Sequence, residues 1–404
     1  MFKAFQLTIY KRDKNFNLED FLFLLSFVAI SFGFNEIAIL FSVYIFFKTR
    51  LSRLQSKKII YFLLPILISG TFLSLYNLDN LESNDFENIL FRIRFYWIRI
   101  IYAITVASYL YNKSYIKILH IIYVLAMANL IIGILELILN SLNGEFSRLN
   151  MLALEPSSSS MFYLFSIPLL FIYGQYFPKK KKYIYFFFFL GLLILSKAQI
   201  LVLIFWATIY LIYLKKSFLK LIVIIFVFVF GYSYIIQLTQ ISVMINLFNV
   251  LSMDGLQALN PQNQVWTSFT LRISSWLSAA NIFITNPFGV GFGQFHLLYI
   301  EYMKTSDIVG AITGPGIDNI LSGDGMYATP KSAFMELLVS SGLFFVIPFV
   351  KLSKKIFNKK NNSFIKISFS SLVLSALMVE IAPFLTFLIF IMILQHKSPT
   401  ENLN

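Results

Sequence analysis

The chain has 404 residues, of which 58% are hydrophobic, and its mean hydropathy is +0.75. This composition excludes an ordinary soluble domain and is typical of a protein with many membrane-spanning helices. The net charge of +14 does not require a nucleic-acid partner, because basic residues gather in the cytoplasmic loops of membrane proteins. Cysteine is absent, which excludes disulfides, thiol nucleophiles and Cys-ligated metals. The three histidines are too scattered along the sequence for a His-rich metal site.

Most basic residues fall in short polar segments between apolar runs. A helix crosses a bilayer with about 20 apolar residues, and basic loops stay in the cytoplasm. Consecutive basic segments must therefore be separated by an even number of crossings, which places both termini in the cytoplasm. Twenty-five of the 33 Lys and Arg residues lie in seven such segments: before residue 20, in 48–58, 112–117, 179–182, 215–220 and 351–366, and after residue 395.

The apolar runs predict an all-α, polytopic integral membrane protein with about 12 transmembrane helices. The first run begins near Phe21 and is followed by further spans, so we interpret it as an anchor rather than a cleaved signal peptide. The first two spans form a short hairpin, and a re-entrant pair would give the same charge pattern. The expected spans are 21–32, 37–47, 59–76, 89–111, 118–140, 161–178, 183–195, 200–214, 220–239, 333–350, 367–379 and 383–395.

This topology divides the chain into three regions. Residues 1–239 form a membrane bundle with spans 1 to 9, residues 240–332 form a long external loop, and residues 333–404 hold spans 10 to 12 and a cytoplasmic tail. A loop of this length is usually functional or carries helices of its own.

The external loop contains an amphipathic pattern over residues 269–284. Ile273, Trp276, Ala280 and Ile284 share one face of a helix, and three serines and Asn281 fill the other. We expect this helix to lie at the outer membrane interface and to end at residues 286–287. Arg272 would then lie where a lipid-linked phosphate is found, although a plain surface anchor has the same pattern.

A second external pattern precedes the sixth span. Pro156 favours the first helical turn, which places Glu155 at the N-cap and residues 157–160, all serine, in the first turn. A helix N-terminus attracts anions, so these serines together with Arg148 would hold a phosphate or a sugar, although ordinary capping explains them equally well. Glu155 is the first candidate for a general base, followed by Asp324 and Glu336.

Eight basic residues lie outside the cytoplasmic segments. Charges within or beside a membrane are costly, so these residues are functional candidates, although extension to the headgroups or pairing with an acid would also account for them. Arg99 lies deepest, and if it faces the bundle it requires an anion. The eight residues are Arg92, Arg94, Arg99, Arg148, Lys197, Arg272, Lys304 and Lys331.

The order of several motifs resembles the superfamily of O-antigen ligases and Wzy-type repeat-unit polymerases. The motifs are E-P-S at 155–157, S-K-A at 196–198, R-x-x-x-W at 272–276, N-P-x-G-x-G-x-G-x-F at 286–295 and P-K-S-A-F-M-E-L-L-V-S-S-G-L at 330–343. The family's ligases carry an Arg at the hairpin turn, an Arg in the long loop and a His eleven residues before a Gly. Lys197, Arg272 and Lys331 stand at these positions here. The missing His argues against a ligase-type base and favours a polymerase.

The resemblance implies a GT-C-like, metal-independent glycosyltransferase without a cofactor in the bacterial plasma (inner) membrane. It would polymerise undecaprenyl-diphosphate-linked oligosaccharides into O-antigen, capsule or exopolysaccharide on the outer face. Expected partners are membrane lipids and a chain-length regulator and flippase of the same pathway. Arg272 would bind the donor diphosphate together with Lys197, Arg148 and Lys331, and Arg99 is a further candidate. The alternatives are an O-antigen ligase that transfers glycan to a lipid or protein acceptor, another lipid-linked glycosyltransferase, and a polysaccharide flippase or transporter.

Overall fold

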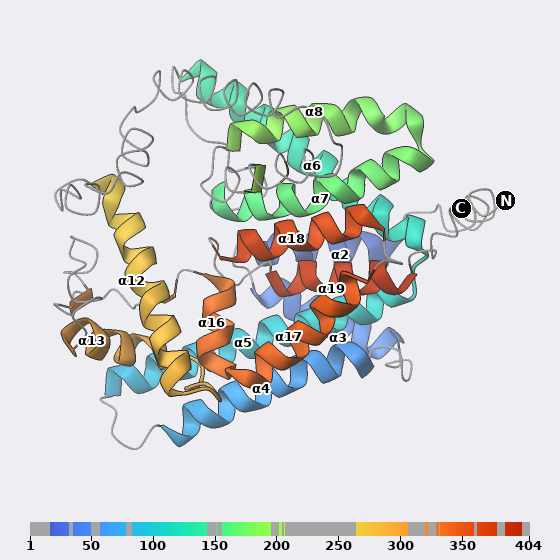
Figure 1. The fold of residues 1–404 in the computed structure, drawn as a ribbon. Coiled ribbons are helices and arrows are strands. Elements are labelled where there is room, and N and C mark those ends of the chain that lie inside the picture. Colours follow the sequence, from blue (N-terminus) through green and yellow to red (C-terminus); the bar gives the residue numbers. More distant parts are fainter. Residues whose placement is uncertain are drawn as a thin grey trace.

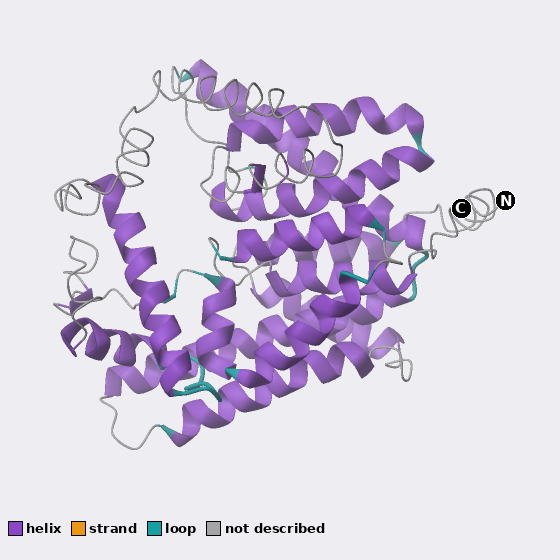
Figure 2. Ribbon diagram, in the orientation of Figure 1, coloured by secondary structure: helices purple, strands orange, loops and turns teal. Residues whose placement is uncertain are grey.

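The described part of the chain is helical throughout. The computed structural model describes residues 17–31, 35–49, 57–77, 83–143, 151, 156–194, 202–203, 206, 264–305, 320–321, 329–330, 332–358, 362–377 and 384–397. No strand occurs in these ranges, so the all-α fold class is confirmed for them (Figure 2). The α-helices are α2 (Leu18–Ser31), α3 (Asn35–Thr49), α4 (Lys57–Tyr76), α5 (Ser83–Tyr111), α6 (Tyr115–Leu142), α7 (Pro156–Tyr176), α8 (Lys181–Gly191), α12 (Gln264–Thr285), α13 (Phe295–Thr305), α16 (Ala333–Ser341), α17 (Leu343–Ile356), α18 (Ser363–Ala376) and α19 (Phe384–Lys397); η1 (Pro178–Lys180) and η2 (Leu192–Ile194) are 3₁₀ turns.

Helices α4 to α7 cover four of the expected spans, and α7 begins at Pro156 as its sequence predicts. Helix α2 has 14 residues and α3 has 15. At 1.5 Å per residue each is about 22 Å long, which is shorter than the hydrocarbon core of about 30 Å. The expected span 220–239 and most of 200–214 lie outside the described residues, so the number of spans stays a prediction.

The helices form a bundle that α12 crosses at one end. In Figure 1, helices α4, α5, α7, α18 and α19 run lengthwise, whereas α12 runs across one end of the bundle. The C-terminal end of α4 and the N-terminal end of α5 lie at this same end, whereas the N-terminal end of α4, the turn between α5 and α6 and the corner between α7 and α8 lie at the opposite end. We call these the α12 end and the basic end, respectively.

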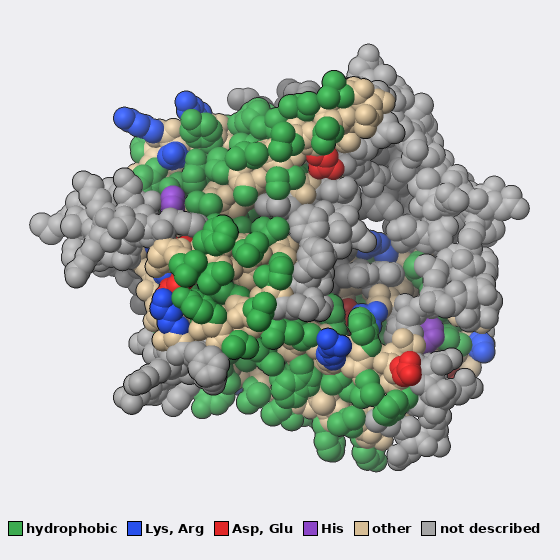
Figure 3. Space-filling view, turned by 180° about the vertical axis from the view of Figure 1, so that it is seen from behind, with side chains coloured by type: hydrophobic (Ala, Val, Ile, Leu, Met, Phe, Trp, Pro, Cys, Tyr) green, Lys and Arg blue, Asp and Glu red, His purple; other side chains and the backbone are tan. Residues whose placement is uncertain are grey.

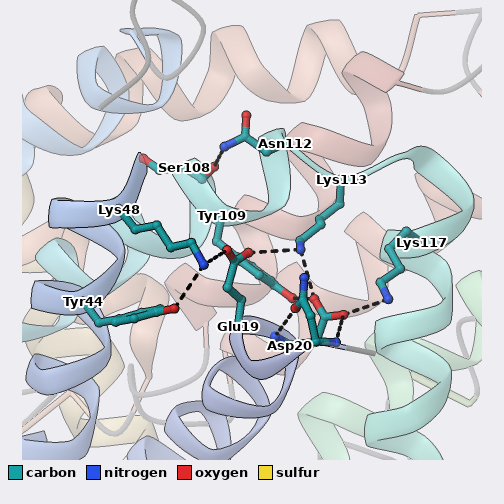
Figure 4. A network of polar contacts seen from close by, with 10 residues as sticks. Glu19, Asp20, Tyr44, Lys48, Ser108, Tyr109, Asn112, Lys113 and Lys117 are labelled. Atoms are coloured by element: carbon teal, nitrogen blue, oxygen red, sulfur yellow. Dashed lines mark hydrogen bonds and ion pairs between the residues drawn. The ribbon is translucent and has the colours of Figure 1, made fainter. Parts of the chain in front are cut away.

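A network of charged and polar contacts joins four helices, α2, α3, α5 and α6, at the basic end (Figure 4). Asp20, at the start of α2, is only 1% exposed. Its carboxylate pairs with Lys113 at 3.0 Å and with Lys117 at 2.8 Å, and it accepts a hydrogen bond of 2.6 Å from the Tyr109 hydroxyl. The neighbouring Glu19 pairs with Lys48, at the end of α3, at 2.7 Å. The network therefore fixes the α2–α3 hairpin to the turn between α5 and α6.

The last helices reach the same end of the bundle. The Lys397 ammonium group donates to the carbonyl of Tyr111 at 2.5 Å and also to that of Lys113. The Gln395 amide donates to the carbonyl of Lys355, near the end of α17, at 3.2 Å. Basic segments from α3, the α5–α6 turn, α17 and α19 thus lie together, which is the arrangement that an even number of crossings requires.

The sides of the bundle expose large apolar side chains. Leu40, Tyr61, Phe72, Ile131 and Phe189 are each between 59% and 68% exposed. Figure 3 shows hydrophobic side chains over much of one face. Among the described helices, the stretches Ile59–Tyr76 and Tyr115–Leu142 are long and apolar enough to cross a membrane.

The expectation of one continuous helix over 333–350 is wrong. Helix α16 ends at Ser341 and α17 begins at Leu343, and Gly342 between them has φ of 51°. The Leu343 amide donates to the carbonyl of Pro287 at 2.8 Å. The chain bends at Gly342 because the segment after α12 docks there, and α17 continues to Ile356 rather than ending at residue 350.

Candidate active site at the α12 end

The glycine motif at residues 286–294, here called the glycine loop, connects α12 to α13 and packs against α16. The amide of Val290 donates to the carbonyl of Val339 at 2.9 Å, and that of Gly291 donates to the carbonyl of Ser340 at 3.1 Å. Two motifs that are forty residues apart in the sequence, 286–295 and 330–343, are therefore joined by backbone hydrogen bonds. The sequence shows both motifs, but it does not show that they touch.

The glycine loop also docks on the C-terminal half of α4. The amide of Phe292 donates to the carbonyl of Gly70 at 3.1 Å, and the Ser74 hydroxyl donates to the carbonyl of Phe292 at 3.0 Å. Gly291 has φ of 101°, and a Cβ there would overlap the backbone of Ser74. The Phe292 ring is fully buried and stacks on Tyr96 of α5, with ring centroids 4.0 Å apart. These contacts fix the loop against α4 and α5 as well as α16.

The glycine loop brings a cation and an acid together. Gly293 lies against the Arg92 stem, since a Cβ there would be 3.3 Å from the Arg92 Cβ. The Arg92 Nη1 atom is 3.8 Å from the Glu336 Oε1 atom. Glu336 lies in the first turn of α16 and is 7% exposed, and the Ser332 hydroxyl caps this helix by accepting from the Met335 amide at 3.2 Å. Pairing with an acid, one of the interpretations of Arg92 from the sequence, is thus observed.

Arg99 lies two helical turns deeper on α5 than Arg92, on the same side of the helix. It is 5% exposed, and its guanidinium lies 4.8 Å from the centroid of the Phe95 ring. Arg94, by contrast, is exposed. Helix α5 therefore directs Arg92 and Arg99 into the bundle and Arg94 away from it.

Helix α12 carries Arg272 and Trp276 four residues apart, on one side of the helix, and both residues are half-buried. The Trp276 indole nitrogen is buried and has no hydrogen-bond partner among the described residues. Figure 3 views the molecule from behind, with the α12 end on the right, and shows a basic side chain inside a hollow at that end.

The serine face of α12 packs inward against α13 and α16. Ser274, Ser275 and Ser278 are fully buried, whereas Ile284 is 74% exposed. Ser274 and the Tyr299 hydroxyl of α13 form a hydrogen bond of 2.7 Å. Burial raises the pKa of the Tyr299 phenol, and hydrogen bonds with Ser274 and Ser275 lower it in part. The neutral phenol therefore serves as a packing and hydrogen-bonding group.

Five of the predicted site residues lie outside the described residues: Glu155, Arg148, Lys197, Lys331 and Asp324. Residue 151 and helix α7, on either side of residues 152–155, are described. Ser159 and Ser160 are buried in the first turns of α7, and the Met151 amide donates to Glu136 of α6 at 2.9 Å. The sequence analysis missed Glu136. This residue could have been found as the single acid within the apolar run LIIGILELILN.

Comparisons of this chain with protein-family models, with curated proteins and with solved structures gave no match. The described residues contain no group of three or more His, Asp or Glu side chains that could hold a metal ion. They do bring the cations Arg92 and Arg272 and the carboxylate of Glu336 to one end of the bundle. Cations there can stabilise an anionic leaving group, and a buried carboxylate can accept a proton.

Proposed function

We propose that this chain is a membrane glycosyltransferase that joins undecaprenyl-diphosphate-linked oligosaccharide repeat units into O-antigen, capsule or exopolysaccharide at the outer face of the plasma membrane. The observation that carries the proposal is the packing of the glycine loop on α16. Two of the motifs that resemble the polymerase superfamily belong to one assembly, and that assembly holds Arg92 beside Glu336.

The membrane placement is supported by the exposed apolar side chains and by the separation of the two ends. Exposed apolar patches of this extent are rare on soluble monomers. The basic end carries the Lys and Arg residues that the positive-inside rule assigns to the cytoplasm, and the α12 end then faces outward.

Reporter fusions test this topology. Fusions after residues 82, 150, 260 and 320 should give an external signal, and fusions after residues 54, 180, 217 and 358 should give an internal one. An internal signal at 260 would remove the outer-face assignment of α12, because this helix begins at Gln264, only four residues later, and carries Arg272.

The proposed reaction is a substitution at an anomeric carbon. A sugar hydroxyl of the incoming repeat unit attacks the anomeric carbon of the growing chain, and the bond from that carbon to the diphosphate oxygen breaks. The hydroxyl proton passes to a carboxylate, and undecaprenyl diphosphate leaves as an anion. Preorganised cations at the developing charge are the main requirement for this chemistry.

Arg272 is the proposed principal ligand of the donor diphosphate, assisted by Lys197, Arg148 and Lys331. Guanidinium suits this role because its fork of N–H groups matches phosphate oxygens, whereas the lysine ammonium acts as a point charge. Glu155, Asp324 and Glu336 are the candidate bases. The structure describes only the last of them, Glu336, which lies 3.8 Å from Arg92.

The replacement Arg272→Ala tests the proposal. Loss of a charge-assisted hydrogen bond to an anion costs about 1.5 to 3 kcal/mol, which corresponds to a rate lower by roughly 10 to 100-fold. Cells that carry the variant should accumulate single lipid-linked repeat units, measured by gel analysis of extracted glycolipids, and Arg272→Lys should recover part of the activity.

Arg94→Ala is the matched control, because Arg94 is an exposed arginine near the same end of the bundle. It should leave the product length unchanged. Long-chain product at normal yield from Arg272→Ala, at equal protein level, would contradict the role of Arg272.

A further inference from the structure

The corner between α7 and α8 presents four consecutive lysines at the basic end. Helix α7 ends at Tyr176, the turn η1 begins at Pro178, and α8 begins at Lys181. All four side chains of residues 179–182 are exposed, and the described residues of this corner include no acid. The corner therefore concentrates positive charge at the basic end of the bundle.

Aromatic rings hold part of this charge in place. The Lys180 ammonium lies 5.7 Å from the ring centroids of Tyr123, on α6, and Tyr183, on α8. Tyr123 stacks on Tyr173 of α7 at 4.9 Å, and the Tyr173 hydroxyl is 2.9 Å from the His120 Nδ1 atom. Lys180 is thus positioned by a layer of rings that spans three helices.

A cavity of about 150 Å³ lies beside the lysines, between α7, α8 and α18. Lys181 and Gln175 line its polar part, and Phe171, Ile184 and Phe364 line its apolar part. The aliphatic stem of Lys181 passes directly over Gly174, where a Cβ would be 3.2 Å from the Lys181 Cγ. The cavity therefore joins a positively charged rim to an apolar interior.

We propose that this corner binds an anionic phospholipid of the cytoplasmic leaflet, with its phosphate on Lys180 and Lys181 and part of an acyl chain in the cavity. The proposal rests on the membrane placement above and not on sugar transfer at the α12 end. Basic pockets between helices on the cytoplasmic side suit anionic headgroups, and the apolar lining distinguishes a lipid from a free phosphate.

Lipid titrations of the purified full chain in a zwitterionic detergent test the proposal. Phosphatidylglycerol should raise the melting temperature in a saturable way, whereas phosphatidylcholine and glycerol phosphate should not. Each lysine near an anionic lipid surface contributes favourable binding free energy. Loss of two lysines should therefore weaken the apparent affinity for phosphatidylglycerol by about 30-fold. The double variant Lys180→Gln/Lys181→Gln should show this loss.

The matched control is Lys354→Gln/Lys355→Gln, which removes the same charge from the end of α17 at the same end of the bundle. It should bind phosphatidylglycerol as the unmodified chain does. Equal affinity in all three proteins would overturn the proposal. An equal shift with glycerol phosphate would also overturn it, because the cavity would then take no part. Reporter fusions that gave the opposite topology would contradict the membrane placement, and this result would be independent of the lipid titrations.

Discussion

Asp20→Asn should destabilise the protein by about 3 to 5 kcal/mol, the usual cost of removing one partner from a buried ion pair. The Asp20 carboxylate is the anion for both Lys113 and Lys117, and Lys117 is itself only 2% exposed. An asparagine keeps the shape but removes the anion that the buried Lys117 ammonium contacts at 2.8 Å, whereas Lys113 keeps its pair with Glu19 at 3.4 Å. Denaturant titration in mild detergent should show the loss as a lower free energy of unfolding.

Glu19→Gln is the matched control for this replacement. Glu19 is the next residue and also pairs with two lysines, but its side chain is 22% exposed. Exposed pairs contribute about 0 to 1 kcal/mol, so this variant should stay close to the unmodified protein. Equal and small losses for both variants would mean that the Asp20 network does not hold α2 to the α5–α6 turn.

Gly291→Ala should abolish most of the proposed polymerase activity. The new Cβ would overlap the Ser74 backbone, and a φ of 101° is strained for alanine. The glycine loop would therefore lose its docked position on α4. The glycine loop packs against Arg92 and against α16, which carries Glu336, and a misplacement of about 1 Å at the proposed reacting centre would lower the rate by about 100-fold. Polymer length on gels should fall accordingly.

Gly174→Ala provides the comparison for Gly291→Ala. Gly174 is also a buried glycine, but it lies within helix α7 with ordinary helical geometry, and its nearest neighbours are flexible side-chain atoms of Lys181 and Ile184. This variant should retain full activity. Normal polymer from Gly291→Ala, at equal protein level, would show that the docked glycine loop is not part of the active assembly.

The sequence predicted local features of the fold because each has a local cause. Helix starts follow capping and proline signals, as at Pro156, and the end of α12 follows from Pro287, since the residue before a proline avoids helical geometry. The gathering of basic segments at one end follows from their alternation with apolar runs. These signals depend on neighbours within a few residues, so no knowledge of tertiary contacts is needed.

Features that depend on distant contacts were not predictable. The serine face of α12 reads as a solvent-facing side, yet Ser274 and Ser278 are buried because small side chains allow close approach of α13 and α16. The bend at Gly342 arises from the docking of Pro287, more than fifty residues earlier. The contact between Arg92 and Glu336 likewise joins helices whose adjacency no local pattern reveals.

The most direct test of the proposed function is polymer formation by the purified protein. Reconstituted in liposomes with undecaprenyl-diphosphate-linked repeat units and excess chelator, it should form a ladder of longer glycans, and the Arg272→Ala protein should form little. This result is expected because cations take the charge of the leaving group directly, without a metal. Polymer that appears only after addition of magnesium or manganese would contradict the proposed role of Arg272 and the other cations at the leaving group, and a complete absence of polymer under either condition would contradict the proposed function.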